Sequence, residues 1–168
     1  MTFKAKDFRN GKKFDFDGKC MQAMEFAVNG DSITVKAKNS KTKEISEITY
    51  NLEDAVKLAE PDSVTMNYTG KTGDQYEFVD MNSWDVFCFD RNIISAYIEL
   101  VPAGTDCDVY FYNGEAIEVI PPKTVFADVI EIRGNKAVIE TGAEIEVSHH
   151  VQEGDSIMID TWFGTSHY

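Results

Sequence analysis

The sequence is poor in the residues on which disulfide-bonded and metal-binding proteins depend. Its three cysteines, Cys20, Cys88 and Cys107, stand singly, and no C-x-x-C pair occurs. An odd and scattered set argues against a disulfide framework and against a zinc site. We therefore expect the three thiols to lie in the interior as small apolar groups.

Long apolar stretches are missing too. No run comes near the roughly 18 apolar residues that a membrane-spanning helix needs. Residues 1–7 are polar and contain no apolar region of a signal peptide. These absences predict a cytoplasmic protein that has no membrane partner.

Signatures of common enzyme classes are equally absent. The sequence contains no Gly-rich phosphate loop, no dinucleotide-binding fingerprint and no nucleophile elbow. His149 and His150 are adjacent, so in the strand that we expect there they would point to opposite faces and could not bind one metal ion. We predict that the protein is not an enzyme and has no catalytic residue, no metal ion and no cofactor.

Basic residues are few, but most of them lie near the beginning. Sixteen Lys and Arg stand against 29 Asp and Glu, a formal net charge of −13, although phosphate binding depends on Lys and Arg. Residues 1–43 nevertheless hold ten basic and five acidic residues, a charge of +5, which leaves −18 for the remainder. This asymmetry predicts a basic module able to meet RNA followed by an acidic body. A chance gradient in a soluble acidic protein is the alternative.

What the sequence does contain is a series of short strand patterns separated by turn residues. Hydrophobic residues make up 43% of the chain and aromatic residues 12%, a composition that favours strands. Over 33–38, apolar residues alternate with Thr34, Lys36 and Lys38, which predicts a strand with both lysines on its solvent-exposed face. Turn signals stand at Asp17-Gly18, Asn29-Gly30, 70–73, Asn113-Gly114, Gly134-Asn135 and Gly154-Asp155.

Two segments have the pattern of short helices. Asn51 is a suitable cap for a helix over 52–59, and 92–100 is apolar enough to cross a sheet as a helix. Strands so short and regularly spaced are typical of Greek-key barrels, so we predict an all-β fold. The remaining strands are expected at 13–17, 21–28, 45–50, 63–68, 76–80, 85–89, 108–112, 115–120, 125–132, 137–140, 144–147 and 156–161.

Several short motifs follow one another in a distinctive order. They are Asp7-Phe8-Arg9-Asn10-Gly11, Met66-Asn67-Tyr68-Thr69, Tyr112-Asn113-Gly114, Pro121-Pro122 and the segment 154–161. This order resembles the bacterial elongation factor P family along nearly the whole chain. The resemblance implies three small β-barrel domains: an SH3/KOW-like barrel at 1–60, an OB-type barrel at 61–124 and a truncated OB-type barrel at 125–168. It also implies a translation factor that binds the ribosome and tRNA near the exit site and promotes peptide bond formation.

The two loops that this family directs at RNA are short in this sequence. The resemblance implies a Lys or Arg at the tip of a first-domain hairpin, within a Pro-Gly-x-Gly loop. Here the tip is Asn29-Gly30-Asp31, without a basic residue, and a two-residue turn cannot extend far from its barrel. In the last domain a tight turn at Arg133-Gly134-Asn135 replaces a Gly- and Thr-rich loop. Trp162 also stands where the family's Asp-Thr-Arg-x-Gly motif has its Arg.

Three functions stay open. The first is a divergent translation factor whose contacts to tRNA or ribosomal RNA would be Arg9, Lys12, Lys13, Lys36, Lys38, Lys41 and Lys43. The second is a non-enzymatic scaffold or protein-binding module on the same fold. It would act through a protein partner or self-association, by edge strands or by the aromatic pair Trp162 and Phe163. The third is a binder of single-stranded nucleic acid on the barrel faces.

Overall fold

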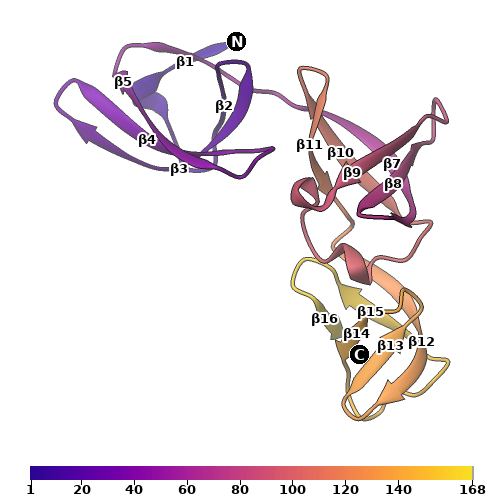
Figure 1. Cartoon of the computed structure of the whole chain (residues 1–168). Coiled ribbons are helices and arrows are strands. Elements are labelled where there is room, and N and C mark those ends of the chain that lie inside the picture. The colour runs from indigo at the N-terminus through magenta and orange to yellow at the C-terminus, as the bar shows by residue number, and fades with distance from the viewer. Residues whose placement is uncertain (168) are drawn as a thin grey trace. The chain divides into compact units, whose positions relative to one another are not determined.

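Strands joined by turns dominate the computed structural model, which describes residues 1–167 (Figure 1). Within these residues there are sixteen strands and three short 3-10 helices. The prediction of an all-β fold built from small barrels is confirmed. Over the described part, none of the helices has the length and apolar character needed to span a membrane.

The strands form four sheets, which contain two, four, five and five strands. The two-stranded sheet consists of β1 (Thr2–Lys4) and β6 (Ala55–Lys57). The four-stranded sheet, called the first sheet below, has the spatial order β2 (Lys13–Phe16), β3 (Lys19–Asn29), β4 (Ser32–Asn39) and β5 (Ile45–Asn51). The middle sheet has the order β11 (Glu115–Ile120), β10 (Asp106–Tyr112), β7 (Asp62–Thr72), β8 (Gln75–Asp80) and β9 (Val86–Asp90). The last sheet has the order β14 (Glu144–Glu146), β13 (Lys136–Ile139), β12 (Thr124–Arg133), β15 (Ser156–Asp160) and β16 (Thr165–His167).

Two compact units can be distinguished along the chain. One comprises Met1–Ser63 with Tyr110–Glu118, and the other comprises Val64–Val109 with Val119–Tyr168. Residues 110–118, which form the turn end of the β10–β11 hairpin, therefore pack with the N-terminal residues, although both strands remain part of the five-stranded sheet. The finer division into 1–60, 61–124 and 125–168 stays a prediction.

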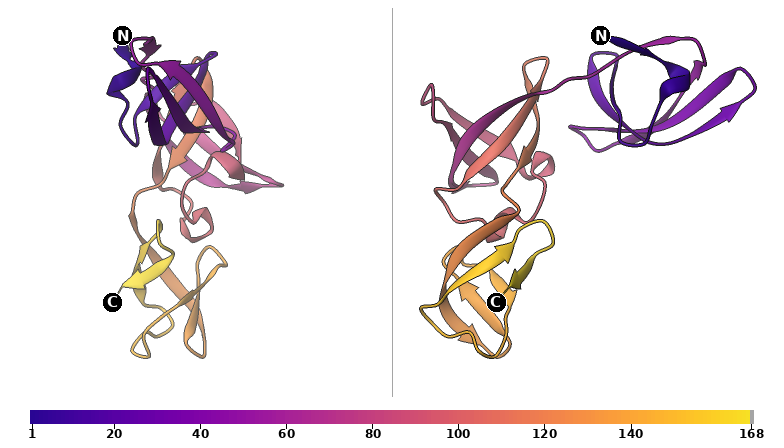
Figure 2. Two further views of the ribbon diagram at one scale, coloured as in Figure 1. Left: turned by 90° about the vertical axis from the view of Figure 1, so that its left-hand side faces the viewer. Right: turned by 180° about the vertical axis from the view of Figure 1, so that it is seen from behind.

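The core of the first unit is centred on aromatic rings. The N-terminal strands include a strongly curved sheet (Figure 2). Helix η1 (Ala5–Asp7) leads into Phe8, which is fully buried. The Phe8 ring meets Phe14 edge to face at 5.0 Å between centroids and meets Phe3 in the same way at 4.9 Å. Such edge-to-face pairs are favoured by the ring quadrupole. Strand β4 adds Ile33 and Val35, both fully buried.

The predicted helix over 52–59 is wrong, because this segment forms a turn followed by strand β6. Asp54 accepts a hydrogen bond from the Asn51 amide at 2.9 Å and closes the turn. Val56 then pairs with Phe3 of β1 and is buried in the core. Pairing with a distant strand and burial of Val56 outweigh a weak local helix preference.

The β10–β11 hairpin contacts the first sheet through matching turns. Asp17-Gly18 and Asn113-Gly114 each have two consecutive positive φ angles, the pattern of type I′ hairpin turns. The Asn113 side-chain amide donates to the Gly18 carbonyl at 3.0 Å. The Tyr112 hydroxyl donates to a carboxylate oxygen of Asp15 at 2.5 Å.

The middle sheet departs from two expectations. The turn expected at 70–73 begins later, because β7 continues through Thr72 with a bulge between Tyr68 and Gly70 (φ of Gly70 136°). The helix expected over 92–100 is two separate 3-10 turns, η2 (Arg91–Ile93) and η3 (Ile98–Leu100). The Arg91 guanidinium donates to the carbonyls of Ile94 and Ala96. These bonds hold the intervening residues out of the helical conformation.

The last sheet contains strands close to the four predicted ranges. Val125, Ala127 and Val129 of β12 are buried together with Ile157 and Ile159 of β15. Strands β12 and β13 are joined by the two residues Gly134 and Asn135, as predicted. The loop between them is therefore a tight turn.

The cysteine expectation is correct for two residues and wrong for the third. Cys20 and Cys107 are buried, and burial raises the pKa of Cys107 to about 12. Cys88 is exposed. Its side chain alternates along β9 with those of Phe87 and the buried Phe89, so the pleat directs it outward.

Tyr112→Phe should destabilise the first unit by about 1 kcal/mol at neutral pH, since it removes one hydrogen bond to a partly exposed carboxylate. Burial, followed by the hydrogen bond to Asp15, raises the pKa of Tyr112 to about 12. The folded-state pKa is above the ordinary value, so this stabilisation is present below about pH 10 and is lost as pH rises toward 12. Urea unfolding from pH 7 to 11 will show the variant losing less stability than the parent protein. Tyr110→Phe is the control, and an equal loss in parent and Tyr112→Phe would contradict the assignment.

Candidate nucleic-acid interface and aromatic turn

The hairpin tip between β3 and β4 does not project from the barrel. Its two loop residues are Gly30 and Asp31, one position later than the predicted Asn29-Gly30 turn, because Asn29 pairs with Ser32. Gly30 has a φ of 63°, and the pattern is that of a type II′ turn, which places glycine first.

The end of the neighbouring strand holds this tip in place. Ser32 pairs with Asn51, the last residue of β5. The Leu52 amide then donates to the Asp31 carbonyl at 2.9 Å. The hairpin therefore ends level with β5, and the charged side chain that it carries at its tip is the exposed carboxylate of Asp31.

Three of the predicted basic residues gather on the outer face of the first sheet. Lys13 of β2 and Lys38 of β4 both pair across Gln22 of β3. Lys43 lies close enough that both lysines act on it electrostatically. Burial, followed by the repulsion of Lys38 and Lys13 and opposed by Glu118, lowers the pKa of Lys43. We call Lys13, Lys38 and Lys43 the lysine cluster.

The Lys43 ammonium is directed by the main chain. Its Nζ donates to the Ser40 carbonyl at 2.5 Å, and Lys43 itself has a φ of 67°. Lys13 Nζ lies 5.7 Å from the ring centre of Tyr110, within the range of a cation–π contact. The aromatic ring and the Ser40 carbonyl thus fix two of the three ammonium groups.

Closer to the tip the positive charge is neutralised. Lys36 is paired across the sheet with Glu25 on one side and Glu47 on the other. Its Nζ lies 3.2 Å from a carboxylate oxygen of Glu25. At the other end of β4, away from the tip, Lys41 forms an ion pair with Glu115. The sheet face is therefore basic at the lysine cluster and close to neutral toward Gly30.

The remaining two predicted contacts lie on the segment that leads into β2. Arg9 is exposed and donates to the Phe8 carbonyl at 2.8 Å. Lys12 Nζ lies 4.1 Å from the centre of the Phe3 ring. The structure thus brings three of the seven predicted residues together in the lysine cluster, whereas the other four lie at separate positions.

Sequence reasoning missed Gln22, Tyr110 and Glu118 as parts of this surface. Gln22 and Tyr110 are linked to Lys13 by pairing and by ring contact, and Glu118 acts on Lys43. Tyr110 and Glu118 come from the β10–β11 hairpin, far away in the sequence. No local pattern indicated that this hairpin packs on the first sheet.

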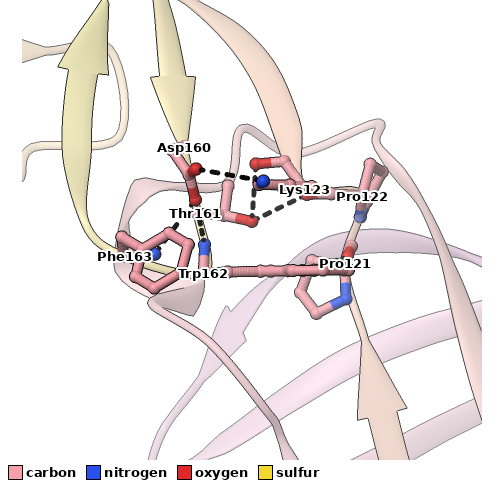
Figure 3. A network of polar contacts seen from close by, with 7 residues as sticks. All are labelled: Pro121, Pro122, Lys123, Asp160, Thr161, Trp162 and Phe163. Carbon is pink, nitrogen blue, oxygen red and sulfur yellow. Dashed lines mark hydrogen bonds and ion pairs between the residues drawn. The ribbon is translucent and has the colours of Figure 1, made fainter.

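A second site is the turn that follows β15, where Asp160 acts as a cap (Figure 3). One carboxylate oxygen of Asp160 accepts hydrogen bonds from the amides of Trp162 and Phe163, at 2.9 and 3.0 Å. The Trp162 indole donates to the Pro121 carbonyl at 3.1 Å. Lys123 Nζ lies 5.8 and 5.7 Å from the ring centres of Trp162 and Phe163.

This turn leaves an aromatic surface open to solvent. The side chain of Trp162 is 48% exposed and that of Phe163 is 68% exposed. Gly164 has a φ of 71°, which favours glycine, and a Cβ there would lie 3.0 Å from the Tyr97 ring. Trp162 therefore has a structural role through Pro121, and Phe163 is the freer aromatic side chain.

The histidine expectation is wrong in its geometry. His149 and His150 lie in a turn rather than in a strand, and their ring centres are 3.9 Å apart. Both are exposed. Within residues 1–167 no cluster of three or more His, Cys, Asp or Glu side chains is arranged to hold a metal ion.

The fold defines a class of all-β proteins made of small barrels. Comparison with known proteins identifies the family. The family model "Elongation factor P, C-terminal" matches residues 127–165. Elongation factor P of Persephonella marina is 33% identical over 143 residues, which cover 79% of this chain and 75% of that protein. The Synechococcus elongatus protein of the same name is 30% identical over 171 residues, 92% of each chain.

A solved structure supports the fold. Eukaryotic translation initiation factor 5A from Methanococcus jannaschii matches with a TM-score of 0.58 at 14% identity, covering 71% of this chain and 94% of that one. The chain belongs to the elongation factor P family of translation factors.

Glu25→Gln should raise affinity for RNA, because it frees Lys36 from its closest carboxylate. With tRNA as the probe at low salt, we expect affinity to rise about two- to threefold, since an exposed ion pair is worth less than 1 kcal/mol. Fluorescence anisotropy over a salt series measures this. Glu60→Gln changes the net charge equally outside the sheet; the same gain in that variant would show that Lys36 takes no part.

Proposed function

We propose that this protein binds the ribosome and tRNA near the exit site, in the cytoplasm, through the lysine cluster on its first sheet. Lys13, Lys38 and Lys43 would contact phosphates, and Arg9, Lys12, Lys36 and Lys41 would add weaker contacts around them. Phosphate contacts of this kind fix the orientation of the nucleic acid and give most of the salt-dependent affinity.

The electrostatics of the cluster support this role. Three ammonium groups held near one another repel, and this repulsion contributes to the lowered pKa of Lys43. A phosphate placed among them would relieve that repulsion, so the electrostatic energy of the cluster would be lower with a bound phosphate than without one. The strongly acidic remainder of the chain confines binding to this face.

The short hairpin tip would limit how strongly such a factor promotes peptide bond formation. Holding a tRNA in one orientation can accelerate peptide bond formation without an acid, a base or a nucleophile, so the protein would not be an enzyme in the usual sense. Here the tip ends level with β5 and carries Asp31 instead of a long cation. We propose that it stabilises the bound tRNA and promotes peptide bond formation only weakly.

Ribosome binding is the first test of this proposal. The protein should co-sediment with ribosomes stalled on consecutive prolines at low salt and dissociate at moderate salt. The double variant Lys13→Gln, Lys38→Gln should bind about tenfold or more weakly, because two phosphate contacts are lost. Lys57→Gln with Lys136→Gln makes the same charge change elsewhere and should bind almost normally. Failure of the unaltered protein to bind at low salt would refute the proposal.

The tip itself can be tested by exchange. Replacing Gly30–Asp31 with a longer loop that carries lysine, in the Pro-Gly-x-Gly form, should increase the rate of peptide bond formation on stalled ribosomes with little change in binding. A matched loop with glutamine in place of that lysine is the control. Equal rates for the original and both loops would show that the tip does not limit activity.

The exposed aromatic turn supports a second candidate, a protein-binding module that uses Trp162 and Phe163. Trp162→Ala would also break the bond to Pro121, so Phe163→Ser is the cleaner variant. If the turn mediates contacts, Phe163→Ser will reduce self-association or partner capture measured by sedimentation velocity while leaving ribosome binding intact. An unchanged sedimentation profile would remove this candidate.

A further inference from the structure

Strand β9 is an open edge. It is the last strand of the five-stranded sheet and, within the described residues, pairs with β8 alone. Unpaired edges offer backbone hydrogen bonds to another chain, and proteins usually block them with lysine, proline or a covering element. Residues 86–90 contain neither lysine nor proline.

The pairing with β8 determines which backbone groups face outward. The Asp80 amide donates to the Asp85 carbonyl at 3.0 Å, so Asp80 and Asp85 form a hydrogen-bonded pair. Hydrogen-bonded and non-bonded pairs alternate along antiparallel strands. Val86, opposite Val79, is therefore in a non-bonded pair, and its N–H and C=O point to the open edge. The same holds for Cys88.

Apolar side chains stand beside this edge. Val86 is 60% exposed, and the loop that precedes it exposes Trp84 (69%) and Met81 (46%). Trp84 has a φ of 63°, a conformation that a bulky residue adopts only at a cost in energy. The loop thus holds a large apolar side chain in solvent with a strained backbone.

The charged side chains of the β8–β9 hairpin are all acidic. Residues 74–90 contain five acidic side chains and no Lys, Arg or His: Asp74, Glu77, Asp80, Asp85 and Asp90. Nucleic acid would be repelled here. A second copy adding the same edge would bring like charges together.

We propose that β9 accepts an extended, basic protein segment as an additional strand. Its main chain would bond to Val86 and Cys88, its lysines or arginines would meet the acidic side chains, and an apolar residue would pack on Trp84 and Val86. Strand addition of this type obtains affinity from the main chain and specificity from alternate side chains. This surface is separate from the lysine cluster, so the proposal does not depend on RNA binding.

A designed peptide tests the proposal on the full chain. The probe is an eight-residue capped peptide that alternates lysine and valine, with binding measured by calorimetry at low salt and by hydrogen exchange of the Val86 and Cys88 amides. We expect salt-dependent binding and slower exchange at both amides. A peptide with glutamate in place of lysine, and one N-methylated along a single edge, should each bind about tenfold or more weakly.

Cys88→Pro removes one outward N–H without breaking the bonds to β8, and Cys88→Ala is its matched control. We expect the proline variant to lose about tenfold in affinity or more and the alanine variant to bind normally. Trp84→Gly should raise Tm by relieving strain and yet bind the peptide less well. If the proline variant does not fold, the N-methylated peptide still decides the matter.

Several outcomes would overturn the proposal. They are absence of binding at low salt, equal binding of the glutamate or N-methylated peptide, and full binding by Cys88→Pro. A dimer of the protein alone that Cys88→Pro dissociates would show that a second copy occupies the edge instead.

Discussion

The double pairing of strand β4 is the constraint on which the proposed RNA surface depends. β4 is bonded to β3 on one edge and to β5 on the other, from Ser32 to Lys38 on the β5 side. This register places Ile33 and Val35 in the core and Lys36 and Lys38 outside. It also aligns Ser32 with the last residue of β5, so the tip cannot project. A shift of one residue would reverse every side chain, so core and surface are determined together.

The charge distribution works at short range in this protein. A net charge of −13 would oppose RNA binding if charges acted over the whole molecule. At physiological ionic strength, however, exposed charges are screened beyond roughly 8 Å. The nearest charged neighbours of each lysine therefore determine the local electrostatic potential. Glu25 and Glu47 neutralise Lys36. The three lysines of the lysine cluster, in contrast, lie beside one another. A local cluster can then bind phosphate on an acidic protein.

The exposed aromatic sites differ in how they are held. The Asp160 carboxylate caps the turn at Trp162 and Phe163, and Lys123 lies over both rings, so that loop is stabilised by polar contacts. Trp84 has a strained backbone at the end of an open strand. Strain that is retained in a surface loop commonly accompanies function. Both the β9 edge and the turn at Trp162 and Phe163 are therefore candidate surfaces for protein contacts.

Local pattern determined the all-β class, the alternation in β4, the presence of strand β12, the shortness of both loops and the family resemblance, because each depends on residues close in sequence. Tertiary structure decided what needs distant partners. Val56 became a strand residue through pairing with β1, and His149 and His150 entered a turn. Cys88 became exposed because the pleat of β9 places it on the face opposite to the buried Phe89. Only folding brought Lys13 beside Lys43 and Tyr110, since contacts between remote segments leave no periodic trace in the sequence.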